Sequence, residues 1–191
     1  MKISAALLTC ILLLVPMVAS AQVTDFTAKT YQDSAGNELS YRILKPANYD
    51  TTKSYPLVLF LHGAGERGSD NYSQLKWGVS HFADPQFREK YPAFVVAPQV
   101  PEGETWAGLP SQSTSSYSHS LSQQPTQPMQ LTIGLLDSLQ QNFNIDLARI
   151  YVTGISMGGF GTFDLIQRMP QQICRRQYLF VVAEISQRHF C

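Results

Sequence analysis

The chain has 191 residues, and its 14 basic and 14 acidic side chains give a formal net charge of zero. No run of basic residues breaks this balance, so we expect neither nucleic acid nor an anionic surface as a partner. The spacings typical of metal sites and of phosphate-binding loops are missing, and we therefore expect no metal and no cofactor.

The N-terminus has the pattern of a secretory signal peptide. Lys2 provides a basic start, residues 5–18 form an apolar run, and residues 19–21 are small. We expect cleavage after Ala21, which predicts a secreted or periplasmic protein. A membrane anchor is the alternative, but the run is shorter than the roughly 20 residues of a spanning helix. We therefore expect no stable membrane anchor after cleavage.

The mature chain is long enough for a single domain with its own core, which we place at residues 22–172. Residues 25–31 and 38–44 flank a turn and predict an antiparallel hairpin. The apolar runs 57–61 and 93–97 are typical of strands that are buried on both faces.

The connecting segments are predicted less directly. Residues 71–79 favour a helix, and residues 103–128, rich in Ser, Gln and Pro, favour a long surface loop. Leucines at helical spacing after Pro128 predict a second helix, which ends within residues 142–146. Strands that alternate with helices indicate an α/β fold, with a mostly parallel sheet and helices on both faces.

The residues that follow carry the strongest functional pattern. A short strand at 150–152 leads into Gly154-Ile-Ser156-Met-Gly158, and residues 160–169 favour a helix. This strand–turn–helix context is what a nucleophile elbow requires, because a strained turn exposes the Ser156 hydroxyl above the sheet edge. Gly154 and Gly158 keep the backbones of strand and helix close together. The alternative is a chance glycine-rich turn.

A second glycine-rich segment follows the strand at 57–61 and should reach the same sheet edge as Ser156. Acyl transfer needs two N–H donors where the carbonyl oxygen becomes negative. We assign them to Met157 and to Ala64 or Gly65, with Gly63 supporting the loop. We expect His62 to fix this loop by hydrogen bonding; a role as catalytic base is the alternative.

With these residues in view, the sequence resembles secreted α/β-hydrolases of the esterase, phospholipase/carboxylesterase and polyhydroxybutyrate-depolymerase-like group, which is related to prolyl oligopeptidase-type hydrolases. The matching segments are 62–68 with Asp70 and Asn71, 97–99 with Trp106, and 154–158. The resemblance implies the α/β-hydrolase fold, Ser156 as nucleophile and cleavage of a carboxylic ester. In such loops Glu66 and Arg67 brace the loop or line the pocket, and a solvated surface pair is the alternative.

The sequence departs from this group after the elbow helix. The triad order Ser, Asp or Glu, His places the acid and the base well beyond Ser156, but the remaining residues offer only Asp164, Glu184 and His189. We expect Asp164 to face away from Ser156, and we do not expect Glu184 and His189 to pair with it. The C-terminal strands of the fold are therefore predicted to be missing, which would expose apolar surface on the elbow strand and its neighbours.

Residues 173–191 form an atypical tail. Cys174 and Cys191 lie in it and could form one disulfide in an exported protein. Residues 178–183 could add one strand. Codons exist for residues 173–185 whose shifted frame encodes Ala-Ile-Pro-Ile-Cys-Gly-Gly-Gly-Asn, which resembles the strand and glycine turn that the group carries at this point. We therefore expect a frameshift here, and the coding DNA tests it.

The sequence predicts a serine carboxylic-ester hydrolase that acts through an acyl-enzyme on Ser156, with a small-molecule or polymeric ester as substrate. Short-chain acyl esters, feruloyl-type esters and polyester oligomers are the candidates. We expect this chain to be impaired and only marginally stable, because the triad acid and base are absent. A non-catalytic α/β binding module and an inactive fragment are the alternatives.

Overall fold

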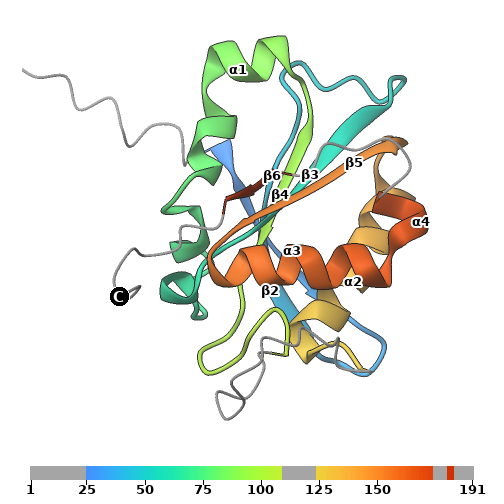
Figure 1. Cartoon of the computed structure of the whole chain (residues 1–191). Coiled ribbons are helices and arrows are strands. Elements are labelled where there is room, and N and C mark those ends of the chain that lie inside the picture. Colours follow the sequence, from blue (N-terminus) through green and yellow to red (C-terminus); the bar gives the residue numbers. More distant parts are fainter. Residues whose placement is uncertain (1–24, 109–123, 174–179, 183–191) are drawn as a thin grey trace, which may run out of the picture.

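A computed structural model of the protein describes residues 25–108, 124–173 and 180–182 (Figure 1). The expected signal peptide and the two cysteines of the tail lie outside these residues. Glu184 and His189 also lie outside them.

The described strands form one mixed sheet. They are β1 (Thr27–Gln32), β2 (Glu38–Leu44), β3 (Tyr55–Leu61), β4 (Phe94–Pro98), β5 (Ile145–Ile155) and β6 (Phe180–Val182), in the spatial order β1-β2-β4-β3-β5-β6. The pair β1–β2 is antiparallel, as the hairpin prediction requires, and β2 is also antiparallel to β4. The strands β4, β3, β5 and β6 run parallel. The carboxyl ends of β3, β4 and β5 therefore meet at one edge of the sheet.

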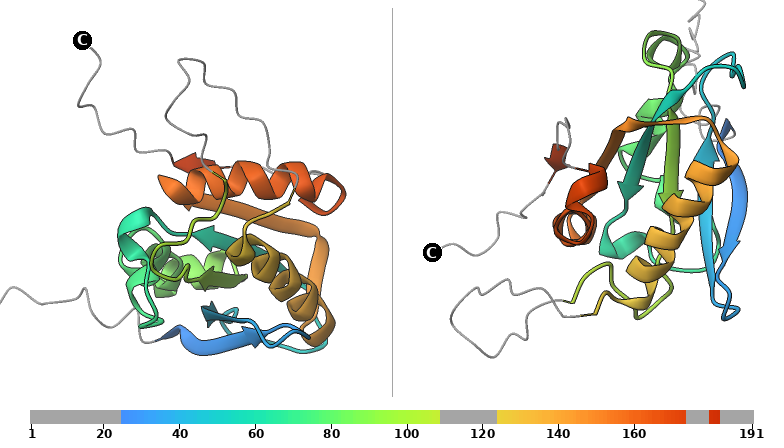
Figure 2. Two further views of the ribbon diagram at one scale, coloured as in Figure 1. Left: turned by 90° about the horizontal axis from the view of Figure 1, so that it is seen from below. Right: turned by 90° about the vertical axis from the view of Figure 1, so that its right-hand side faces the viewer.

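Helices lie on both faces of this sheet (Figures 1 and 2). The α-helices are α1 (Pro85–Lys90), α2 (Gln127–Asn142), α3 (Met157–Arg168) and α4 (Pro170–Ile173), and the 3₁₀ helices are η2 (Ala64–Glu66), η3 (Ser73–Leu75) and η4 (Val79–Ala83). None of the helices in the described part of the chain is long and apolar enough to cross a bilayer.

Alternation along β3 explains the two layers of the core. Leu57, Leu59 and Leu61 point to one face, where they pack in a cluster with residues of α2, α3 and α4. Phe60 points to the other face and packs with residues of η3 and η4. The prediction of a strand buried on both faces is thus confirmed for β3.

Three of the predicted elements differ from the structure. The helix expected at 71–79 is wrong: the chain forms η3 and η4 instead, because Asn71 (φ 48°) and Gly78 (φ 76°) take backbone conformations that an α-helix excludes. The strand expected at 150–152 extends over Ile145–Ile155, and residues 147–149 before the predicted start are exposed. Helix α3 begins at Met157, three residues before the predicted start at Phe160.

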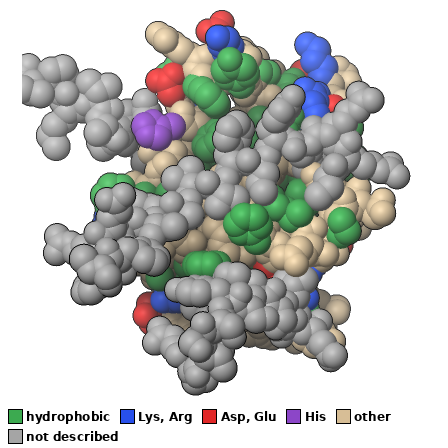
Figure 3. All heavy atoms as spheres, in the orientation of Figure 1, with side chains coloured by type: hydrophobic (Ala, Val, Ile, Leu, Met, Phe, Trp, Pro, Cys, Tyr) green, Lys and Arg blue, Asp and Glu red, His purple; other side chains and the backbone are tan. Residues whose placement is uncertain are grey.

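Apolar side chains also reach the surface. Phe160 and Phe163 of α3 are about half exposed, and on the face in Figure 3 apolar groups lie nearer the middle while charged groups lie toward the margins.

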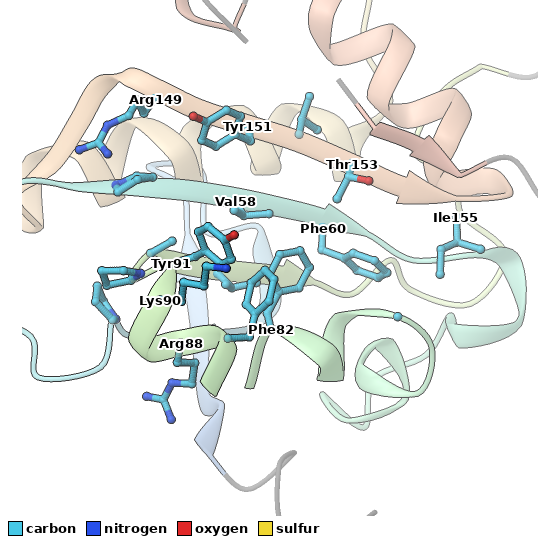
Figure 4. A pocket seen from close by; sticks show the side chains of 18 residues that line it. Val58, Phe60, Phe82, Arg88, Lys90, Tyr91, Arg149, Tyr151, Thr153 and Ile155 are labelled. Atoms are coloured by element: carbon cyan, nitrogen blue, oxygen red, sulfur yellow. The ribbon is translucent and has the colours of Figure 1, made fainter. Parts of the chain in front are cut away.

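A groove of about 830 Å³ lies along β3 and β5, on the sheet face opposite α2 and α3 (Figure 4). Val58 and Phe60 of β3 line it together with Tyr151 and Ile155 of β5, and Tyr91 lies across from them. Parallel strands are normally covered on both faces. In the described part of the chain, this face of β3 and β5 borders the groove and is not fully packed by helices.

Candidate active site

Ser156 lies in the turn between β5 and α3. Its backbone angles are φ 51° and ψ −114°, a combination that costs a non-glycine residue of the order of 1–3 kcal/mol. The residue is exposed, and no hydrogen bond joins its hydroxyl to any described residue. The chain thus holds a serine hydroxyl at the carboxyl edge of the sheet in a strained turn, as a nucleophile elbow does.

Two glycines allow the elbow to form. A Cβ added at Gly154 would lie 2.3 Å from the Gly158 carbonyl oxygen, and one added at Gly158 would lie 1.9 Å from the Leu61 carbonyl oxygen. Both contacts are with backbone atoms, which cannot move aside as a flexible side chain can. The closeness of strand and helix therefore excludes any side chain at these two positions.

The glycine-rich loop after β3 reaches the elbow. A Cβ added at Gly63 would lie 3.8 Å from Ser156 Cβ, so the two segments are in contact. Ala64 and Gly65 open η2, and Met157 opens α3. The first N–H groups of a helix have no partner inside it. The structure thus places Gly63, which directly precedes Ala64 and Gly65, beside Ser156, and Met157 follows the serine in the chain.

His62 is tied into the protein through both ring nitrogens. Nδ1 lies 2.6 Å from the Gly63 carbonyl oxygen, and Nε2 accepts a hydrogen bond of 2.9 Å from the Val100 amide. The ring is therefore neutral, with its proton on Nδ1. Burial, together with the nearby charge of Arg67, lowers the pKa of His62 to about 4, although the hydrogen bond to Gly63 acts in the opposite direction. This geometry supports the structural role for His62, since neither nitrogen is available to Ser156.

Trp106 holds the loop from the other side. Its indole N–H donates to the His62 carbonyl oxygen at 2.9 Å, and its ring meets the His62 ring edge-on. Gly161 of α3 gives it room, because a Cβ there would lie 2.5 Å from Trp106 Cβ. The sequence singled out Trp106 only by resemblance; in the structure it links the glycine-rich loop, helix α3 and the segment after β4.

A buried amide organises the next part of the loop. The Gln99 side chain donates to the Glu66 carbonyl oxygen at 3.1 Å and to Asp70 Oδ1 at 2.7 Å, and it accepts from the Asn71 amide at 2.7 Å. Asp70 in turn accepts from the hydroxyl and amide of Ser73, and these bonds hold its pKa well below the usual range. This network fixes the course of the loop beyond η2.

Glu66 and Arg67 do not pair with each other. Glu66 is buried, whereas Arg67 donates to the Glu104 carbonyl oxygen at 2.6 Å and to the Met157 sulfur at 3.0 Å. The structure therefore favours the bracing alternative over a solvated surface pair.

Asp164 lies on α3 and forms a two-point ion pair with Arg168, with N–O distances of 2.6 and 2.9 Å. The sequence expected this carboxyl group to face away from Ser156, and no contact between the two residues is present. The other described histidine, His81, lies exposed on η4. No cluster of His, Cys, Asp and Glu that could hold a metal ion occurs in the residues the structure describes.

Comparison with known proteins places the chain in a family. The sequence model of the Esterase family matches residues 33–174. The bifunctional acetylxylan esterase/xylanase XynS20E of Neocallimastix patriciarum is 27% identical over 147 residues, which cover 77% of this chain and 18% of that protein.

Two solved structures are similar. A thermostable esterase is 38% identical with a TM-score of 0.69, and the match covers 79% of this chain and 40% of that one. A ferulic acid esterase from Anaeromyces mucronatus is 20% identical with a TM-score of 0.50, over 78% of this chain and 55% of that one. The chain thus spans about half or less of the length of these proteins. It belongs to the Esterase family and has the α/β-hydrolase fold.

Proposed function

We propose that this chain carries the nucleophile and the oxyanion hole of a serine carboxylic-ester hydrolase that acts through an acyl-enzyme. The observation that carries the proposal is the contact between the glycine-rich loop and the elbow, where Gly63 borders an exposed and strained Ser156. Family membership supports the same chemistry.

In this mechanism the Ser156 hydroxyl loses its proton to water as its oxygen attacks the ester carbonyl carbon, and the carbonyl oxygen becomes negative. The amide of Met157 and that of Ala64 or Gly65 donate hydrogen bonds to this oxygen. Collapse of the intermediate releases the alcohol, which takes up a proton, and leaves the acyl group on Ser156. Water then hydrolyses the acyl-enzyme and restores the serine.

Proton transfer limits what the described residues can do on their own. A serine hydroxyl is a weak nucleophile without an adjacent base, and His62 has both nitrogens engaged. Loss of a triad base costs on the order of a million-fold in turnover. We therefore propose that the described residues by themselves support only slow hydrolysis that depends on the oxyanion hole.

The substrate class follows from the relatives. One is described as an acetylxylan esterase and another as a ferulic acid esterase, so we propose short-chain acyl or feruloyl esters, including those on plant polysaccharide. The pattern of residues 1–21 supports export with cleavage after Ala21. We propose residues 22–172 as the catalytic domain.

The test uses residues 22–191 and p-nitrophenyl acetate. We expect slow hydrolysis that falls to the rate of the buffer in Ser156→Ala, while Ser54→Ala, an exposed serine at the opposite end of β3, keeps the rate of the parent. A rate unchanged by Ser156→Ala would end the proposal. Fast turnover lost in Ser156→Ala would instead show that the chain holds a working base.

A further inference from the structure

We propose that Arg67 is a positioning residue that holds the two halves of the oxyanion hole together. The inference rests on the proposed function, since it concerns the same site. Arg67 follows η2, which supplies one candidate amide donor, and its guanidinium reaches Met157, which supplies the other.

The contacts of Arg67 connect three segments that are far apart in the sequence. From the glycine-rich loop, Nη2 lies 3.0 Å from the Met157 sulfur at the start of α3. Nε lies 2.6 Å from the carbonyl oxygen of Glu104, in the segment after β4. The amide of Gly68 adds a backbone bond of 2.9 Å to Val100 in that segment. The side chain therefore connects the loop and the elbow, which are far apart in the sequence.

The hydrogen-bond acceptors of Arg67 are neutral groups. Its partners are a carbonyl oxygen and a thioether, whereas Arg168 on α3 engages a carboxylate. No carboxylate of the described residues forms an ion pair with Arg67, and the buried Glu66 carboxylate next to it in the sequence is directed at Gly63 instead. A thioether is a soft acceptor that packs well against a flat cation. The arrangement suits a residue that orients backbone amides through neutral contacts.

The two donors must face one oxygen atom at the same time. Displacement of about 1 Å in such a site can cost a hundred-fold in rate. Removing the Arg67 bridge frees the Met157 side chain and the end of η2, so the amides lose their alignment in the transition state. The hydrogen bonds from the two amides stabilise the bound substrate less than they stabilise the transition state. The substitution should therefore lower kcat and leave KM unchanged.

The kinetic test compares Arg67→Gln, Arg67→Lys and a matched control, Arg88→Gln. Arg88 is also a half-buried arginine that donates to a backbone carbonyl, but it lies on α1, away from the elbow. We expect Arg67→Gln to lower the Ser156-dependent kcat about ten-fold with KM unchanged, Arg67→Lys to recover part of it, and Arg88→Gln to leave it unchanged. An unchanged kcat in Arg67→Gln would overturn the inference.

A second measurement does not depend on turnover. With methyl-labelled methionine, the Met157 methyl signal is assigned by its loss in Met157→Leu. We expect Arg67→Gln to shift this signal and to speed hydrogen exchange at the amides of residues 64–66 and 157, and Arg88→Gln to do neither. Unaltered Met157 signals in Arg67→Gln would overturn the inference even if Ser156 is active. Hydrolysis that ignores Ser156→Ala would instead remove the proposed function.

Discussion

At the scale of single residues, strain and close approach are concentrated around Ser156. The positive φ of Ser156 is kept because Gly154 and Gly158 let strand and helix meet at backbone contact. The neighbouring His62 is neutral and fully bonded. The geometry around Ser156 thus depends on residues that have no side chain or that are neutral near pH 7.

The first prediction concerns Gly158→Ala. The added methyl group would lie 1.9 Å from the Leu61 carbonyl oxygen, so the strand and helix must separate, and we expect a loss of more than about 3 kcal/mol in the free energy of unfolding. Gly65→Ala is the control, because no atom lies within 4 Å of its added Cβ. We expect that variant to stay within about 0.5 kcal/mol of the parent in urea denaturation. Equal stability of the two variants would contradict the close contact.

The second prediction concerns pH. The pKa of His62 falls from 6.5 to about 4 on folding, mainly through burial. Between these values the unfolded chain binds a proton that the folded chain does not, so the free energy of unfolding decreases as the pH falls through this window. The slope is about 1.4 kcal/mol per pH unit for one proton.

Urea denaturation between pH 4.5 and 7 measures this slope. The carboxyl groups with lowered pKa values, such as Asp33 and Asp146, start from 3.8 and act only at lower pH. In His62→Gln the slope in this window should vanish. A slope that persists in His62→Gln would assign it to another group.

At the scale of elements, α3 is the helix that both presents the site and anchors it. Its first turn offers the Met157 amide, and Gly161 packs against Trp106. Its last turn carries the ion pair between Asp164 and Arg168, whose side chains are only 5% and 13% exposed. Asp164 therefore stabilises the helix and is not an acid for Ser156.

The third prediction contrasts two ion pairs. Arg168→Met leaves the buried Asp164 carboxylate without its partner, and we expect a loss of about 3 kcal/mol in the free energy of unfolding. Arg149→Met breaks a more exposed pair with Asp146, with side chains 48% and 27% exposed, and we expect less than about 1 kcal/mol. Thermal and urea denaturation of both variants measure the difference. Similar losses would show that the Asp164 pair is no better shielded from water.

At the scale of the whole molecule, the parallel strands are covered unevenly. One face of β3 and β5 is packed by α2 and α3, while the other borders the apolar groove (Figure 4). Apolar surface of this kind lowers the gain from folding and invites association.

The fourth prediction tests the groove with the dye ANS. We expect residues 22–191 to enhance ANS fluorescence at neutral pH while keeping near-UV circular dichroism, which distinguishes a groove from a molten globule. Tyr91→Lys should reduce the enhancement, because Tyr91 lines the groove and is 54% exposed. Tyr72→Lys is the control, since Tyr72 is 57% exposed and does not line the groove. Equal enhancement in both variants would place the dye elsewhere.

The parts of the fold that could be predicted are those encoded by local pattern. The hairpin, the buried runs in β3 and β4, and the elbow follow from alternation, apolar runs and glycine spacing. The prediction of a helix at 71–79 was wrong because the local sequence does not reveal the positive φ angles of Asn71 and Gly78. The long β5 was missed because its early residues, such as Leu147, are exposed and carry no strand pattern.

The sequence by itself determined which groups are available for the reaction. These are a serine between glycines and a second glycine-rich loop, each preceded by a strand. Backbone sterics and strand periodicity act over a few residues, so such features can be read locally. Only the tertiary structure decided that His62 is bonded at both nitrogens, that Arg67 bridges to Met157 rather than pairing with Glu66, and that Asp164 belongs to Arg168. These partners lie up to 90 residues apart, and the choice among several acceptors depends on packing that no local pattern contains.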